Sequence, residues 1–217
     1  MNPKLALVLV LPAVLALATP VLAFAQQAGG PLPGTDAASI GADAGRGLAG
    51  RGAINLAAGD GNAQANLAAI ALSPDGLGLI ELQAQQRIAL APAPRAELRA
   101  RDASARIDGH AFADSSGLLS VNQAAGGGNA QLNLFALGNA DAAIAASGPA
   151  GLDDAALAAV AGNYPTEGTE PPPGLRHAVI AEDAFRGSQG VVQVNQTAGV
   201  GNFSTNAIVL QLPGGAP

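Results

Sequence analysis

A pattern of thirteen residues occurs three times in the chain, and this repeat constrains the fold more than any other feature. The copies span Ile54 to Asn66, Val121 to Asn133 and Val194 to Asn206, so their starts are 67 and then 73 residues apart. They share the pattern V/I-N-x-A/T-A-G-x-G-N-x-Q/S-x-N. Internal similarity of this kind predicts that one structural unit is built three times and that the units stack on one another.

Each copy predicts a strand, a tight turn and a second strand. Side chains alternate between two unlike sets from Val191 to Thr197, which is typical of a pleated strand with two different faces. Glycines and an asparagine follow, and these residue types adopt positive φ most readily. The turn glycines are Gly59, Gly61, Gly126, Gly128, Gly199 and Gly201. The expected fold class is therefore all-β, with three stacked strand-turn-strand rungs.

Two ways of closing each rung fit this pattern. In a hairpin, the two strands of one copy form hydrogen bonds with each other. In a β-arch, they face each other through their side chains, and each strand pairs with its counterpart in the next copy. Identical polar residues at identical offsets favour the arch, and thus a β-solenoid capable of cross-β assembly, because only stacking gives a reason to keep the same residue at each position. The hairpin stays open as the alternative.

Stacking would collect the amide side chains into columns. Amides about 4.7–4.8 Å apart can form hydrogen bonds along a column, as in the Asn/Gln ladders of cross-β assemblies. The positions expected to stack in this way are Asn55, Asn62, Asn66, Asn122, Gln123, Asn129, Gln131, Asn133, Asn195, Gln196, Asn202 and Asn206.

The distribution of charge favours stacking as well. No charged residue lies between Ser115 and Ala140, none follows Arg186, and Asp60 is the one charge inside the first copy. Stacked like charges would repel each other at every step, so a unit that stacks on itself must exclude them. Ordinary soluble sheets instead place charges on their edge strands to prevent pairing. The charge pattern therefore predicts self-association.

The segment before the repeats has the features of a secretory signal peptide. Lys4 precedes an apolar run over residues 5–18, and Ala23-Phe24-Ala25 fits a cleavage site before Gln26. We therefore expect residues 1–25 to be removed, with export and no membrane insertion after cleavage. A retained membrane anchor is the less favoured alternative.

The rest of the chain divides around the three copies. We expect a disordered segment over residues 26–45, repeats over 46–72, 117–137 and 190–217, and long irregular linkers over 73–116 and 138–189. Residues 77–86 of the first linker have the pattern of an extra strand, and residues 95–106 that of a solvated coil or helix. In the second linker, residues 152–161 have the composition of a short helix.

The sequence contains no pattern typical of a catalytic or metal-binding site. The chain has no cysteine and a net charge of −6, which excludes thiolate chemistry and argues against a nucleic-acid partner. His110 and His177 have no metal-ligand spacing around them. We expect no catalytic residue, no metal, no cofactor and no enzymatic activity.

The repeated V-N-Q-A-A-G-x-G-N-x-Q-x-N pattern, behind a signal peptide and separated by long linkers, resembles the fibril subunits of Fap-type bacterial functional amyloid. It is similar, more loosely, to curli-type subunits. The resemblance implies export through the periplasm, passage through an outer-membrane channel, and assembly into extracellular fibres that stiffen biofilm. It leaves open whether the chain is a major, a minor or a nucleating subunit.

The sequence thus favours a secreted structural or adhesive protein, located outside the cell or at its surface, whose main partner is itself. Other amyloid subunits and an outer-membrane export channel are expected as further partners. Two alternatives stay open: an accessory protein that nucleates or chaperones another amyloid subunit, and a soluble surface or periplasmic β-fold binding protein.

Overall fold

The computed structural model describes residues 34–71, 78–83, 98–139, 142–147 and 173–212, and most of these residues lie in strands. A helical turn covers residues 98–100. The strands are β1 (Thr35–Ile40), β2 (Ala49–Ala58), β3 (Ala63–Ala71), β4 (Gly78–Gln83), β5 (Asp102–Ile107), β6 (Ser116–Ala125), β7 (Ala130–Asn139), β8 (Ala142–Ser147), β9 (Arg176–Ile180), β10 (Gln189–Ala198) and β11 (Phe203–Leu212).

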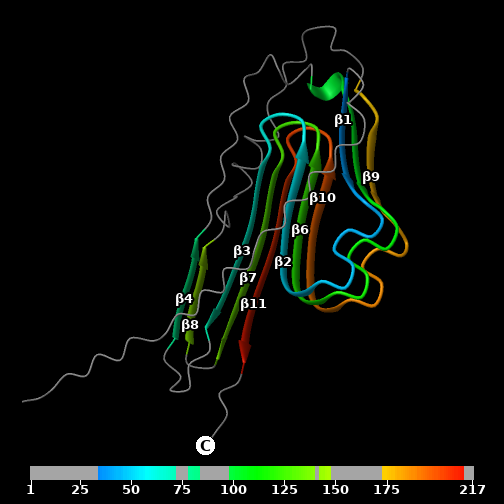
Figure 1. Ribbon diagram of the computed structural model, residues 1–217. Coiled ribbons are helices and arrows are strands. Elements are labelled where there is room, and N and C mark those ends of the chain that lie inside the picture. Colours follow the sequence, from blue (N-terminus) through cyan, green and yellow to red (C-terminus); the bar gives the residue numbers. More distant parts are fainter. Residues whose placement is uncertain (1–33, 72–77, 84–97, 140–141, 148–172, 213–217) are drawn as a thin grey trace, which may run out of the picture.

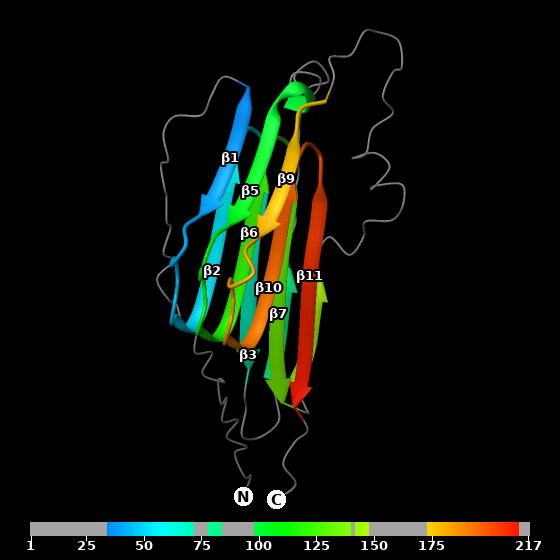
Figure 2. The same ribbon diagram turned by 90° about the vertical axis from the view of Figure 1, so that its right-hand side faces the viewer.

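The strands form three stacked rungs. The first rung consists of β1 to β4, the second of β5 to β8 and the third of β9 to β11. Consecutive strands of a rung lie in different sheets, and each strand pairs in parallel with its counterpart in the neighbouring rung (Figure 1). The sheets are therefore β1-β5-β9, β2-β6-β10, β3-β7-β11 and β4-β8. Figure 2 shows β1, β5 and β9 side by side in front of the next sheet.

The pairing confirms the β-arch. β2 pairs with β6 and β6 with β10, whereas β2 forms no ladder with β3, the next strand of its own rung. The register of β2, β6 and β10 aligns Asn55 with Asn122 and Asn122 with Asn195. The hairpin alternative is wrong, because it would have paired β2 with β3 and left the repeated polar residues out of register.

The structure differs from the sequence-based expectation outside the repeats. Residues 26–45 were expected to be disordered, yet Thr35–Ile40 form β1; Asp102–Ile107, expected as part of a coil or helix, form β5. Both strands bury small alternate residues such as Ala38 and Ala105, which a short alanine-rich segment hardly distinguishes from a linker. β4 lies within the segment where an extra strand was expected. The expected helix at 152–161 and the signal peptide lie outside the described residues.

The apolar core lies between the β1-β5-β9 and β2-β6-β10 sheets. Ile107 and Leu119, both in the second rung, belong to this core and are almost completely buried. The rungs at the two ends of the stack differ from the middle one because a neighbour covers only one of their sides. In the column of Ile107, Ile180 of the third rung is 46% exposed. In the first rung, Ile40 of the same column is only 6% exposed, so the loss of burial in this column is confined to the third rung.

A corner that contains stacked phenylalanines connects the β1-β5-β9 sheet to the β2-β6-β10 sheet. Phe112 and Phe185 have φ of 59° and 60°, a left-handed conformation that bulky residues rarely adopt. Their rings stack with centroids 5.3 Å apart. In the first rung Gly45 takes this place with φ of 65°, and a Cβ there would lie 2.5 Å from the Phe112 ring. The stacked rings stabilise a corner that its backbone conformation alone disfavours.

Truncating two leucines that differ in burial tests the assignment of the core. Leu119→Ala should lower the free energy of unfolding by about 2–5 kcal/mol, since it removes a core side chain and leaves a cavity. Leu210→Ala, at a site that is 42% exposed, is the matched control and should cost clearly less. Urea denaturation of freshly diluted monomer measures both. Equal losses would contradict the assignment of the core.

Candidate functional site: the amide ladders

Asparagine side chains fill the space between the β2-β6-β10 and β3-β7-β11 sheets. Asn55, Asn122 and Asn195 project from the first sheet toward Asn66, Asn133 and Asn206 on the second. Asn122 and Asn133 of the middle rung have no exposed surface. Buried amides destabilise a fold unless their polar atoms find partners, so their hydrogen bonds decide whether the rungs can stack.

Each column forms hydrogen bonds along the stack. In the column from β2, β6 and β10, the Asn122 amide donates to Oδ1 of Asn55 and the Asn195 amide to Oδ1 of Asn122, both at 3.0 Å. In the facing column, Asn133 donates to Asn66 at 2.9 Å and Asn206 to Asn133 at 3.0 Å. In these two asparagine columns donation runs from the later rung to the earlier one, so both ladders have the same direction.

The two columns are also bonded to each other across the arch. The Asn122 amide donates to Oδ1 of Asn66 at 3.1 Å and to the Ala65 carbonyl at 2.8 Å. In turn, the Asn133 amide donates to Oδ1 of Asn122 at 3.0 Å and to the Val121 carbonyl at 3.1 Å. Such a fully bonded polar network specifies the register strongly, because a shift of one residue would leave every amide without partners.

The turn asparagines form a third column of hydrogen-bonded amides. Asn129 donates to Oδ1 of Asn62 at 2.9 Å and Asn202 to Oδ1 of Asn129 at 2.8 Å. These two Oδ1 atoms also accept the backbone N–H of the next turn, each at 3.0 Å. Gly126 fits between the turns because it has φ of 98° and no Cβ, which would lie 2.1 Å from the Gly199 carbonyl oxygen. The turns thus stack as closely as the strands.

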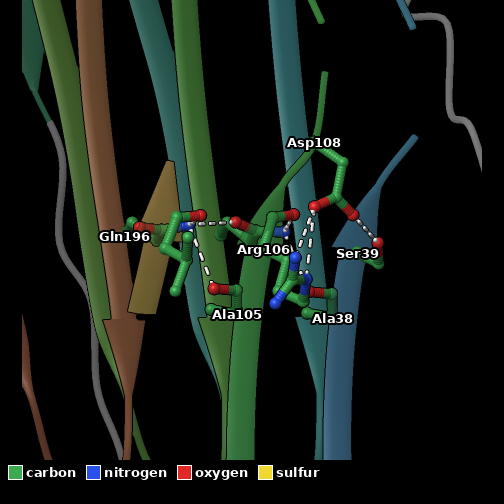
Figure 3. Close-up of polar contacts among 8 residues, drawn as sticks. Ala38, Ser39, Ala105, Arg106, Asp108 and Gln196 are labelled. Atoms are coloured by element: carbon green, nitrogen blue, oxygen red, sulfur yellow. Dashed lines mark hydrogen bonds and ion pairs between the residues drawn. The ribbon is translucent and has the colours of Figure 1, made fainter. Parts of the chain in front are cut away.

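The glutamines divide between two interfaces. Gln196 donates to Oε1 of Gln123 at 2.9 Å, and Gln123 donates to the Ala38 carbonyl at 3.0 Å, so this column joins the β2-β6-β10 sheet to the β1-β5-β9 sheet. Figure 3 shows Gln196 beside Ala105, whose carbonyl accepts from it at 3.2 Å. Gln131 lies on the other side of β6 and donates to the Gln123 carbonyl at 2.9 Å.

Sequence reasoning missed two amides of this network. Gln64 donates to Oε1 of Gln131 at 2.7 Å, and its place in the shared pattern was sufficient to identify it. Gln193 is 2% exposed; it accepts from the Ser120 hydroxyl at 3.1 Å and donates to the Leu134 carbonyl at 3.0 Å. Its column contains Ala53 and Ser120, so no repeated residue marked it.

The ladders end differently on the two faces of the stack. Among the described residues, the Asn55 amide nitrogen of the first rung has no acceptor, and Oδ1 of Asn202 and of Asn206 in the third rung have no donor. One face therefore offers an amide donor and the other offers amide acceptors. A further rung of the same shape would continue the network on either face.

The described part of the chain contains no cluster of three or more side chains that could hold a metal ion. Within the same residues, no helix has the length and apolar character needed to cross a membrane. The geometry of the site is that of a repeating polar surface, and its chemistry is hydrogen bonding between identical groups.

Comparison with known proteins gives a family. A family model described as the functional amyloid protein FapB/FapC family matches residues 22–213, a span that contains all three rungs and the segments between them. No solved structure matches the chain.

Two substitutions in one column test the ladder. Asn122→Asp places a carboxylate against three oxygens to which the amide now donates, so it should lower the free energy of unfolding by about 3–5 kcal/mol. Asn55→Asp is the matched control, because Asn55 acts only as an acceptor among the described residues and its Oδ1 keeps both donors. Chemical denaturation of the monomer measures both, and a comparable loss in the control would argue against the ladder.

Proposed function

The chain belongs to the functional amyloid protein FapB/FapC family, and on this premise we propose that it polymerises into extracellular amyloid fibres by adding further rungs to its own stack. The family is one of structural amyloid proteins. In this proposal the protein is a structural or adhesive part of the biofilm matrix or cell surface. The predicted amide positions of the first and third rungs would contact further copies, and those of the middle rung stack inside the chain.

The observation that carries the proposal is that the stack has two open ends. Successive backbone N–H groups of a strand point to opposite sides, and Gln189 donates its N–H to the Ser115 carbonyl of the second rung at 2.8 Å. The N–H groups of Val192, Val194 and Gln196 therefore point away from the stack. Such a row of unpaired groups is a template for another strand.

Exposed apolar side chains lie at the same end. Most of the large apolar residues with exposed surface belong to the third rung or directly precede it: Leu175, Val179, Ile180, Val192, Val209, Leu210 and Leu212. Residues at equivalent positions of the second rung, such as Leu119 and Ile107, are buried by a neighbour. Covering the third rung with another rung would bury this surface in the same way.

The open ends also bear on the two alternatives. A soluble binding protein would need edges that prevent pairing, and the repeats carry almost no charge to do so. An accessory nucleator is the second candidate. Leu56 stands where the other copies have Gln123 and Gln196, so the glutamine column would be interrupted in every third rung of a fibre.

Delivery to the outside of the cell forms part of the proposal. The expected signal peptide supports export to the periplasm, and family membership supports passage through an outer-membrane channel and contact with other amyloid subunits.

Fibre diffraction tests the proposal. Residues 26–217, diluted from denaturant and held at tens of micromolar, should give reflections near 4.7 Å and about 10 Å, the spacings between strands and between sheets. The variant Val192→Pro should stay folded but fail to form fibres. Its N–H is not bonded within the chain, and proline removes this outward donor and adds a ring at the edge.

Val192→Thr, which keeps the N–H, is the control and should assemble like the natural chain. Centrifugation of the fibres against the soluble fraction measures all three. A natural chain that stays a cooperative monomer would reject the proposal.

A further inference from the structure

We propose that the fibre has a single polarity: the third rung of one copy stacks on the first rung of the next, in the same parallel register that joins the rungs inside each copy. This inference rests on the proposed function and specifies its partner surface. The alternative is a junction between two like faces, third rung to third rung or first to first.

The amide ladders favour the polar junction. Within the molecule, Asn122 donates from the second rung to both Asn55 and Asn66 of the first. Continued in register, the unused Asn55 amide of the next copy meets the unused Oδ1 of Asn206. A junction of two third rungs would bring acceptor to acceptor at Asn202 and Asn206 and would leave these polar atoms buried without donors.

A charge pair gives a second, independent argument. The register aligns Asp36 of β1 with Ala103 of β5 and Ala103 with Arg176 of β9. A Cβ at Gly59 would lie 3.1 Å from the Asp36 carboxylate, and one at Gly199 would lie 3.0 Å from the Arg176 side chain. Asp36 and Arg176 therefore occupy equivalent inward positions in the first and third rungs, at opposite ends of the stack. In the polar junction they become neighbours.

Asp36 already has one partner within its own chain. Arg101 donates to both of its carboxylate oxygens, at 2.6 and 3.1 Å, and Asp36 is 5% exposed. This side-chain hydrogen bond raises the pKa of Arg101, so the guanidinium stays charged. An ionised carboxylate has about four acceptor positions, which leaves room for Arg176 of the next copy. In a junction of two third rungs, two copies of Arg176 would instead face each other.

The ion pairs in the exposed loops at the corners do not favour one type of junction over the other. Arg46 pairs with Asp43 of its own loop and with Asp114 of the next loop, and Arg186 pairs with Asp183, all on half-exposed or exposed side chains. Such pairs are worth little because water screens them. The ladder and the inward charges therefore decide the polarity.

Two glycines at the ends of the stack provide the third argument. A Cβ at Gly117 or Gly190 would lie 2.1 or 2.2 Å from the carbonyl oxygen of the preceding rung, whereas at Gly50 it meets nothing within 4 Å. At the turn, a Cβ at Gly126 would strike the Gly199 carbonyl of the following rung, while one at Gly199 meets only the Arg176 side chain and the Asn202 amide. Each end glycine thus faces the space that the polar junction would fill.

Complementation between two blocked variants tests the polarity. Gly50→Ala should block the first-rung face and Gly199→Ala the third-rung face, so each variant alone should stay monomeric. Mixed one to one, they should form a heterodimer through the two faces left open. Sedimentation velocity of full-length exported chain measures the species. Gly47→Ala controls for the addition of a methyl group at a glycine with positive φ: Gly47 has φ of 67°, a Cβ there meets nothing within 4 Å, and this variant should still form fibres.

The outcomes separate this inference from the proposed function. Absence of fibres from the natural chain would reject the function itself. Fibres from the natural chain, together with homodimers of either blocked variant or with no heterodimer in the mixture, would overturn the polarity.

The charge pair has its own matched test. Arg176→Gln and Arg176→Glu both lose the hydrogen bonds that Arg176 donates to the Arg99 and Arg101 carbonyls. Only the glutamate adds repulsion against Asp36 of the next copy, so its elongation rate on preformed fibres should be roughly tenfold below that of the glutamine variant. Equal rates for the two variants would remove Asp36 and Arg176 from the junction.

Discussion

Hydrogen bonding between identical amides at identical heights is the constraint on which the rest of the structure depends. A side-chain amide can donate to the same group one strand further along only if the strands are parallel and in register. That requirement fixes the arch, because a hairpin would place different residues opposite each other. It also fixes the stacked turns, where the bonds between Asn62, Asn129 and Asn202 need glycines without a Cβ beside them.

The side-chain contacts that hold the sheets together differ in chemistry between the two spaces that separate the sheets. Between β6 and β5 the contacts are apolar, with Ile107 and Val121 buried and the Gln123 amide bonded to backbone carbonyls. Between β6 and β7 the contacts are polar, with Asn122 and Asn133 bonded across the arch. The apolar layer favours collapse, which is not directional, whereas the amide layer selects one register among many. Together they give a stack that is both stable and specific.

The three amide columns were predictable because the same letter recurs at the same offset, and stacking is the physical reason for such recurrence. The strands β1, β5 and β9 were not predictable in this way. Their sequences agree mainly in a small residue and an isoleucine, such as Ala105 and Ile107, and the other positions differ even in charge. The corner was also hidden, since Phe112 with positive φ breaks the rule that glycine marks such conformations.

The outermost sheet leads to a consequence for the fibre as a material. β4 and β8 pair with each other, and the third rung has no matching strand among the described residues. In a polymer of the described residues, the outer sheet would have a strand in two of every three rungs. Its density would then vary along the axis with a period of about 14 Å, three times the strand spacing of about 4.8 Å. The surface of the filament would then have one ridge per protein copy, repeated at that spacing.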